Sequence, residues 1–372
     1  MLAWTTGFRR AWDGGSPVDK KDIPAIDHGR RRFLSTAGTA VLAIGTGGLV
    51  AGTADAQADA AKRVGMPTVT PKTSATFGPV RHIKAGVLNV GYVAAGPADG
   101  RAVILMHGFP YDIHSYVEVT PLLAAEGYRV IVPYFRGYGT TTFLSSATPR
   151  SAEQAAFALD ILALMDALKL GKAILAGYDW GARTGDIIAA LWPDRCRALV
   201  SVSGYLITNL AAERKPLPPK AEWAWWYQYY FATERGVLGL TDYRHDLGEL
   251  IWKFNSPTWH FDTATYDRTA AAFNNPDYVP IVIDNYRWRL SLAKSQPQYA
   301  GIEARLQHTP VIAVPAITID GEYDPFTAPG HGAAYRDKFA GKYAHEALPV
   351  GHNVPQEAPH AFAEAVTKVD SF

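Results

Sequence analysis

The segment from Ala173 to Arg183 constrains the fold of this chain most, because it reads as a strand, a tight turn and a helix start. Four apolar residues, Ala173–Ala176, predict a buried strand. The next five residues are Gly177-Tyr178-Asp179-Trp180-Gly181. Glycines on both sides of the central residue suit a sharp strand-to-helix turn, and such turns usually carry a serine nucleophile. Here the central residue is a carboxylate.

A carboxylate at this position changes the chemistry that the turn supports. A serine must lose a proton before it attacks, whereas an ionised Asp179 can displace a leaving group at saturated carbon and form an ester. The alternative is that Asp179 only caps the following helix, but the flanking glycines favour a nucleophile. The sequence therefore predicts epoxide opening or halide removal rather than ordinary ester or peptide hydrolysis.

Short apolar strands alternate with helical segments along most of the chain, which predicts a mostly parallel eight-stranded sheet covered on both faces. A hairpin turned at Ala85-Gly86 makes one edge antiparallel. The predicted strands are Val80–Lys84, Val87–Ala94, Ala102–Met106, Arg129–Val132, Ala173–Ala176, Ala198–Val202, Pro315–Ile319 and Glu346–Val350. Between the predicted strands Ala198–Val202 and Pro315–Ile319, residues 208–300 are helical in pattern and rich in Trp and Tyr. This insertion predicts a cap over the carboxyl ends of the strands.

Composition excludes several classes of function. The formal net charge of +1 over 372 residues gives no excess of positive charge with which to bind nucleic acid or an anionic membrane. Cys196 is the single cysteine, so an intramolecular disulfide and a cysteine metal cluster are both excluded. It lies between a predicted helix and strand with no base nearby in sequence, which indicates a structural role.

Residues 1–58 are typical of an export signal rather than of a folded domain. Arg30 and Arg31 precede Phe-Leu, an apolar run follows from Ala37 to Ala54, and small-residue cleavage sites end at Ala56 and Ala58. The paired arginines resemble a twin-arginine signal, which implies the twin-arginine export machinery as a partner and a periplasmic or secreted product. The alternative is a retained membrane anchor. Residues 59–75 form a polar lead-in.

The order of motifs resembles the α/β-hydrolase fold, with a core at residues 76–207 and 301–372 interrupted by the helical cap. In that family the nucleophile, the orienting acid and the base follow one another along the chain. The resemblance implies that Asp179 is the nucleophile, Asp324 the acid and His352 the base. Asp320 and Glu322 are the other candidate acids, with Glu322 as the fallback. His345 is expected to precede the last strand on the surface.

His107-Gly108-Phe109-Pro110 resembles the H-G-x-P segment of epoxide hydrolases and related dehalogenases. The resemblance implies an oxyanion hole made by the backbone N–H groups of Phe109 and Trp180. His107 and Pro110 are expected next to the substrate, and a structural role is the main alternative for His107.

Two cap segments resemble those that carry the ring-opening tyrosines of epoxide hydrolases. They are Trp226–Phe231 and Asp284–Trp288, and the matching residues are Tyr227 and Tyr286. A phenol is neutral at pH 7 and can protonate the alkoxide that develops as a ring opens. Trp226 and Tyr230 are predicted to contact substrate, and Tyr229 and Tyr230 are the alternative acids by register.

Dehalogenases share the aspartate nucleophile, so haloalkane or haloacid dehalogenation stays open. Phe109 replaces the Asn that often binds halide in the H-G-x-P segment. Arg183 lies where fluoroacetate dehalogenases carry a carboxylate-binding arginine, but Trp180 occupies the companion position. A structural ion pair is the alternative for Arg183.

The resemblance as a whole implies an exported epoxide hydrolase for a small apolar or aromatic substrate, with neither an organic cofactor nor a metal. Other hydrolase activities and a non-catalytic periplasmic binder remain alternatives. The sequence gives no indication of the oligomeric state.

Overall fold

The computed structural model describes residues 76–327 and 331–372. The predicted export signal and lead-in, residues 1–75, lie outside the described residues. Within the described part, no helix is both long and apolar enough to cross a membrane.

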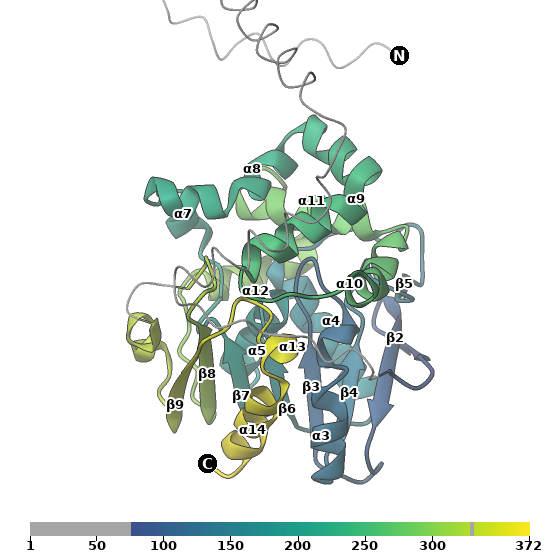
Figure 1. Ribbon diagram of the computed structural model, residues 1–372, viewed down its shortest axis with the longest axis vertical. Helices are drawn as coiled ribbons and strands as arrows, with labels where there is room; N and C mark the ends of the chain where they lie inside the picture. The colour runs from purple at the N-terminus through teal and green to yellow at the C-terminus, as the bar shows by residue number, and fades with distance from the viewer. Residues whose placement is uncertain (1–75, 328–330) are drawn as a thin grey trace, which may run out of the picture. The chain divides into compact units, whose positions relative to one another are not determined.

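A nine-stranded sheet forms the centre of the fold, in the order β1-β2-β4-β3-β6-β7-β8-β9, with β5 paired to β2 (Figure 1). The pairings of β2 with β1, β4 and β5 are antiparallel, and the pairings from β4 through β9 are parallel. The strands are β1 (Arg81–Ala85), β2 (Leu88–Ala95), β3 (Ala102–Met106), β4 (Arg129–Pro133), β5 (Thr142–Phe143), β6 (Ala173–Gly177), β7 (Cys196–Val202), β8 (Ala316–Gly321) and β9 (Tyr343–Leu348).

The predicted α/β fold with a mostly parallel sheet is confirmed, and two details of the prediction are wrong. The sheet has a ninth strand, β5, which is two residues long and too short to leave a periodic pattern. The last strand begins at Tyr343 rather than Glu346, so His345 lies within it and pairs with Thr318 of β8. Because β9 lies at the edge of the sheet, it is only half buried. The prediction followed the apolar residues after it and therefore placed the start of the strand too late.

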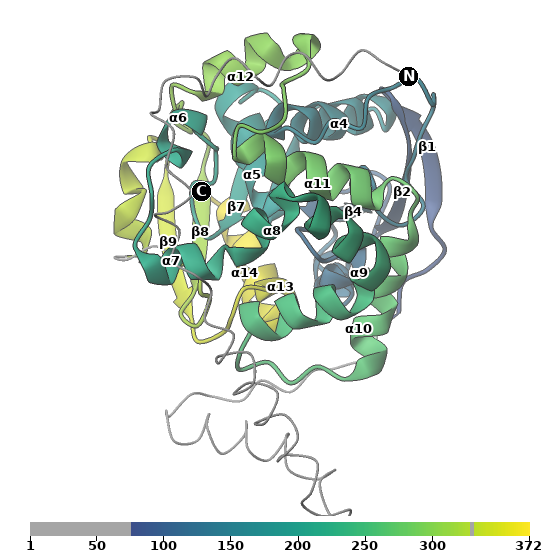
Figure 2. The same ribbon diagram turned by 90° about the horizontal axis from the view of Figure 1, so that it is seen from above.

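Helices cover both faces of the sheet: α3 and α14 lie on one face, and α4 and α5 on the other (Figures 1 and 2). The central strands β3 and β6 are buried along their whole length, which explains their continuous apolar sequence. The four helices on the faces are α3 (Val119–Ala125), α4 (Gln154–Ala167), α5 (Trp180–Leu191) and α14 (Pro359–Asp370), and the short helix α13 (Val354–Glu357) precedes α14.

A helical cap interrupts the alternation between β7 and β8. Viewed from above, α8, α9 and α11 lie across the sheet, where the loops that follow the parallel strands emerge (Figure 2). Local side chains set its helix starts: Thr233 accepts the N–H of Gly236 at α9, and Asp262 accepts that of Thr265 at α10. The helices are α6 (Leu210–Glu213), α7 (Pro219–Ala224), α8 (Trp226–Ala232), α9 (Glu234–Asn255), α10 (Thr263–Ala270), α11 (Tyr278–Arg289) and α12 (Ala300–Leu306).

Candidate active site

Asp179 occupies a strained turn between β6 and α5. Its φ of 52° and ψ of −122° place it in a region that side chains rarely adopt, at a cost of about 1–3 kcal/mol. Its carboxylate caps no helical N–H. A Cβ added to Gly108 would lie 2.4 Å from the Cβ of Asp179, and one on Gly181 would lie 1.9 Å from the carbonyl oxygen of Met106. The neighbouring glycines therefore give the turn the space that it needs.

His352 lies between two carboxylates. Its Nδ1 is 2.7 Å from Asp324 Oδ2, and its Nε2 is 3.7 Å from Asp179 Oδ2. The backbone N–H of Phe326 donates to the other oxygen of Asp324 at 2.9 Å. The hydrogen bond to Asp324 fixes the orientation of the ring, which leaves Nε2 toward Asp179. The structure thus brings together all three residues that the sequence predicted as nucleophile, acid and base.

The alternative acids and the second histidine lie elsewhere. Glu322 is exposed, and Asp320 accepts a hydrogen bond from the hydroxyl of Tyr335 at 2.8 Å. His345 contacts Thr318 at 3.0 Å on the outer part of the sheet.

The charges of the three residues are strongly coupled. Burial alone would lower the pKa of His352, but the negative charges of Asp324 and Asp179 raise it to about 10. Burial alone would raise the pKa of Asp179, yet His352 and then Arg183 hold it below its usual value. At neutral pH the resting site therefore contains an ionised Asp179 beside a protonated His352, a combination that favours attack by the carboxylate.

The backbone N–H of Phe109 donates to Asp179 Oδ1 at 2.7 Å. This hydrogen bond holds one carboxylate oxygen and leaves Oδ2 on the side of His352. Trp180, the other predicted oxyanion residue, is the first residue of α5, and its ring stacks on Phe109 at 5.7 Å between centroids. A donor aimed at Asp179 can also stabilise negative charge that develops on this oxygen.

Tyr227 of α8 and Tyr286 of α11 meet above Phe109. Both are almost fully buried, and their ring centroids lie 5.4 Å apart and 5.9 and 5.2 Å from that of Phe109. Burial raises the pKa of both hydroxyls, so both remain neutral phenols. The alternative Tyr229 is exposed and donates to Glu222 on the outside of the cap.

The other residues predicted to contact substrate interact mainly with other residues of the protein. Burial lowers the pKa of His107 to about 4, and its Nε2 accepts the N–H of Phe135 at 3.2 Å. The carbonyl of Pro110 accepts from the indole of Trp252 at 2.8 Å. Trp226 and Tyr230 are half-buried neighbours, with ring centroids 6.2 Å apart.

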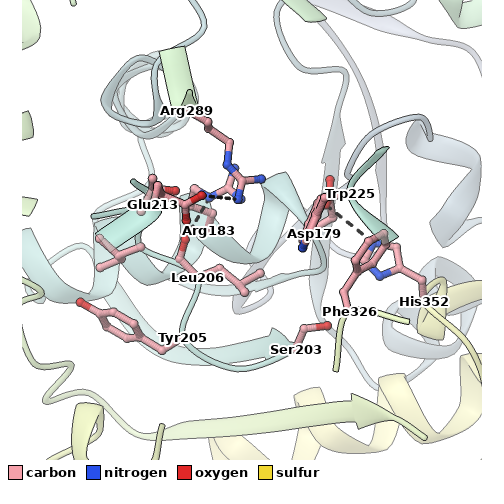
Figure 3. Close-up of a pocket in the computed structure, with 12 residues that line it drawn as sticks. Asp179, Arg183, Ser203, Tyr205, Leu206, Glu213, Trp225, Arg289, Phe326 and His352 are labelled. Atoms are coloured by element: carbon pink, nitrogen blue, oxygen red, sulfur yellow. Dashed lines mark hydrogen bonds and ion pairs between the residues drawn. The ribbon is translucent and has the colours of Figure 1, made fainter. Parts of the chain in front are cut away.

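A pocket of about 170 Å³ opens beside Asp179 and His352 (Figure 3). Sequence reasoning missed several of its lining residues because they are brought together only by the fold. They include Glu213, Trp225, Arg289 and Phe326. Of these four residues, Arg289 could have been found from the sequence, because it lies three residues after Tyr286 on α11 and so shares its face of the helix.

Cys196 is buried at the start of β7, and burial raises the pKa of its thiol to about 12. Among the described residues, no cluster of three His, Cys, Asp or Glu side chains is arranged to hold a metal ion.

Known proteins resemble this chain over most of the described residues. Residues 101–359 match the family model of the alpha/beta hydrolase fold. A candidate epoxide hydrolase from Klebsiella pneumoniae, known from its crystal structure, is 55% identical with a TM-score of 0.79, and the match covers 81% of this chain and 100% of that one.

Curated relatives match over shorter segments. Epoxide hydrolase B of Mycobacterium tuberculosis is 34% identical over 170 residues, or 42% of this chain and 46% of the relative. A haloalkane dehalogenase of Mycobacterium marinum is 34% identical over 125 residues, or 32% and 40%. The chain thus spans less than half the length of these two relatives.

Proposed function

The chain belongs to the alpha/beta hydrolase fold family, and from this premise we propose that it hydrolyses epoxides to vicinal diols through an ester on Asp179. The observation that carries the proposal is the convergence of an ionised carboxylate, a histidine–aspartate pair and two buried phenols. Similarity to proteins named as epoxide hydrolases supports the same reaction class.

In the first step Asp179 Oδ2 attacks a ring carbon, and the bond from that carbon to the ring oxygen breaks. Tyr227 and Tyr286 hydrogen-bond the ring oxygen, and one of them supplies the proton that the alkoxide takes up. Phe109 N–H holds Oδ1 during the attack, at the 2.7 Å seen in the free protein. The product of this step is a hydroxyalkyl ester.

Ester formation removes the negative charge of Asp179, which is one of the two charges that keep His352 protonated. The imidazole can then give its proton, by way of solvent, to the tyrosinate that ring opening left, and act as a base, still oriented by Asp324. It takes a proton from water, and the hydroxide attacks the ester carbonyl of Asp179. The N–H groups of Phe109 and Trp180 stabilise the oxyanion. Its collapse breaks the ester bond to the leaving alkoxide, which takes the remaining proton of the added hydroxide, so that the diol leaves and Asp179 is again a carboxylate.

Single-turnover mass spectrometry of His352→Gln tests this proposal. Without the base, the ester should accumulate, so the peptide that contains Asp179 should gain the whole mass of a styrene-type epoxide. His308→Gln removes an exposed histidine and serves as the control, which should turn the epoxide over without accumulating an adduct. A folded His352→Gln protein that forms no adduct with any epoxide would contradict the proposal.

Dehalogenation is the second candidate function, and the buried indole N–H of Trp180 is the observation that favours it. This N–H has no hydrogen-bond partner among the described residues and could bind a departing halide. Similarity to a haloalkane dehalogenase agrees with this alternative. The same His352→Gln experiment with haloalkanes and haloacids distinguishes the reactions, because only a dehalogenase would release halide as the ester forms.

We further propose that Arg30 and Arg31 direct export of the folded protein by the twin-arginine route. Replacing both by Lys should keep the protein in the cytoplasm of a bacterial host, as measured by cell fractionation. Replacing Arg9 and Arg10 by Lys is the matched control and should leave export unchanged. Export of the Arg30→Lys, Arg31→Lys protein at the normal rate would exclude this route.

A further inference from the structure

A second group of charged side chains lies in the same pocket and takes no direct part in the bond-making steps of the proposed reaction. Arg183 comes from α5, Glu213 from the end of α6 and Arg289 from the end of α11. Figure 3 shows these three gathered on one side of the pocket, with Asp179 and His352 on the other. The pocket therefore has a cationic end and a reactive end.

The two arginines are buried and close enough to repel each other. Each is 7% exposed. Burial and the nearby charge of Arg289 lower the pKa of Arg183 to about 10. Arg183 donates its Nε to the carbonyl of Leu206 at 2.9 Å, and it forms no ion pair with a carboxylate in the part of the chain that the structure describes.

Glu213 compensates this charge only in part. Its Oε2 lies 3.4 Å from a terminal nitrogen of Arg289, and its side chain is 34% exposed. Ion pairs that are long and open to water are weak, so Glu213 can leave without a large penalty. The Nε of Arg289 is buried and has no hydrogen-bond partner among the described residues. A buried guanidinium with an unused donor is the kind of group that an incoming oxyanion satisfies.

We propose that Arg183 and Arg289 bind a carboxylate of the substrate, and that Glu213 occupies their end of the pocket until the substrate displaces it. This inference rests on the proposed function and narrows its substrate class to epoxides that carry a carboxylate. The pocket of about 170 Å³ is small for a ligand site, which favours a compact acid.

The charge of Asp179 gives such a substrate its direction. A carboxylate beside the ionised nucleophile would be repelled, whereas the two guanidinium groups attract it. The acid therefore binds with its charge at the cationic end, and the uncharged epoxide ring lies toward Asp179. Trp225 lines the pocket and carries Arg289 over its ring at 5.0 Å, which helps to hold the guanidinium in place.

Glycidate and glycidamide test the inference, because they differ in charge but hardly in size. The readout is the ratio of kcat/KM for the acid to kcat/KM for the amide within each variant. We expect the wild type to prefer the acid. Arg289→Gln should lower the ratio about 10- to 100-fold, as for the loss of a charged hydrogen bond. Glu213→Gln removes the competing carboxylate and should raise the ratio several-fold.

Arg305→Gln is the matched control, since it removes an exposed arginine from α12 and should leave the ratio unchanged. Glu213→Gln also keeps the test decisive if Arg289→Gln does not fold. A ratio that changes in neither Arg289→Gln nor Glu213→Gln, or a wild type that prefers the amide, would overturn the inference.

Binding of butyrate and butyramide, measured by ligand-observed NMR, separates this inference from the proposed function. If neither epoxide alkylates the protein but butyrate binds more tightly than butyramide in an Arg289-dependent way, the anion site stands and the reaction is wrong. If glycidamide alkylates Asp179 while butyrate binds no better than butyramide, the reaction stands and the anion site is wrong.

Discussion

At the scale of single residues, the protonation state of His352 depends on Asp179. Because two carboxylates together raise the pKa of His352 to about 10, removing one of them should lower it. We expect Asp179→Asn to shift the His352 pKa down toward its ordinary value of 6.5, with Asp324 still holding it partly raised. Titration of the imidazole by nitrogen-15 NMR measures the change directly.

Asp166→Asn provides the control for this titration, since Asp166 is an exposed carboxylate that pairs with Arg195 on the surface. It should leave the His352 titration as it is in the wild type. An unchanged His352 pKa in Asp179→Asn would show that the 3.7 Å contact does not couple the two groups, and the base would then need another way to lose its proton.

The same raised pKa makes stability depend on pH. A histidine whose pKa is higher in the folded state adds stability below its unfolded pKa, and that contribution is lost as the pH rises through the folded value. Removing His352 also leaves Asp179 and Asp324 without their buried counter-charge. We therefore expect His352→Gln to cost about 3–5 kcal/mol at pH 6 and clearly less near pH 10.

Urea unfolding of both proteins at the two pH values measures this difference. His308→Gln, at an exposed position, should unfold like the wild type at either pH. A stability loss in His352→Gln that grows between pH 6 and pH 10 would contradict the pairing described here.

At the scale of elements, Glu357 of α13 joins the loop of His352 to the end of cap helix α9. Its two oxygens accept the backbone N–H groups of Gly351 at 2.9 Å and Asn353 at 3.1 Å, and the hydroxyl of Ser256 at 2.6 Å. The backbone N–H of His352 itself donates to the last carbonyl of α9 at 3.1 Å. The proposed base therefore lies on a loop that hydrogen bonds hold on both sides.

Glu357→Ala should loosen this loop. Three buried donors lose the carboxylate as an acceptor, and Asn353 N–H keeps only its long contact of 3.4 Å with the Ser256 hydroxyl, so the free energy of unfolding should fall by about 1–3 kcal/mol. Hydrolysis of the ester should slow more than its formation, because only the second step uses His352 as a base. Rapid-quench mass spectrometry would show this as ester that accumulates during turnover.

Glu364→Ala on α14 is the control, because Glu364 is exposed and should affect neither stability nor ester hydrolysis. Ester hydrolysis at the wild-type rate in a folded Glu357→Ala protein would mean that Glu357 does not position the base.

How far the sequence predicts each element depends on how local its signal is. Asp179 could be found because the glycines that create its turn are its neighbours in sequence. The start of β9 could not be found in this way, because it is set by pairing with β8 and not by an apolar pattern in its own sequence. Glu213 and Arg289 are 76 residues apart, and neither belongs to a motif. Only the packing of α6 and α11 over the sheet brings them to one pocket.

At the scale of the whole molecule, the reactive site is complete only where the cap meets the sheet. Phe109 comes from the loop after β3, whereas Tyr227 and Tyr286 come from two separate cap helices, and all three rings are in contact. The proposed nucleophile and base belong to the core, and the proposed proton donors belong to the cap. In the proposed reaction, attack and ring protonation therefore require the cap and the core to be correctly placed against each other.

Replacing Tyr227 and Tyr286 by Phe separates the contribution of the cap from that of the core. Each single variant, Tyr227→Phe or Tyr286→Phe, should slow alkylation of Asp179 by an epoxide about 10²- to 10⁴-fold, the usual range for a general acid. The double variant should abolish alkylation, because no phenol remains to protonate the ring oxygen. A haloalkane needs no such proton, so a dehalogenase would keep its rate in the double variant.

The matched control is Tyr229→Phe, which removes the exposed hydroxyl on the outside of α8. Its alkylation rate should equal that of the wild type. The rates are measured on the His352→Gln background, where the ester cannot turn over and each protein reacts once. Full epoxide alkylation in a folded double variant would remove the cap phenols from the reaction and leave the core to open the ring without them.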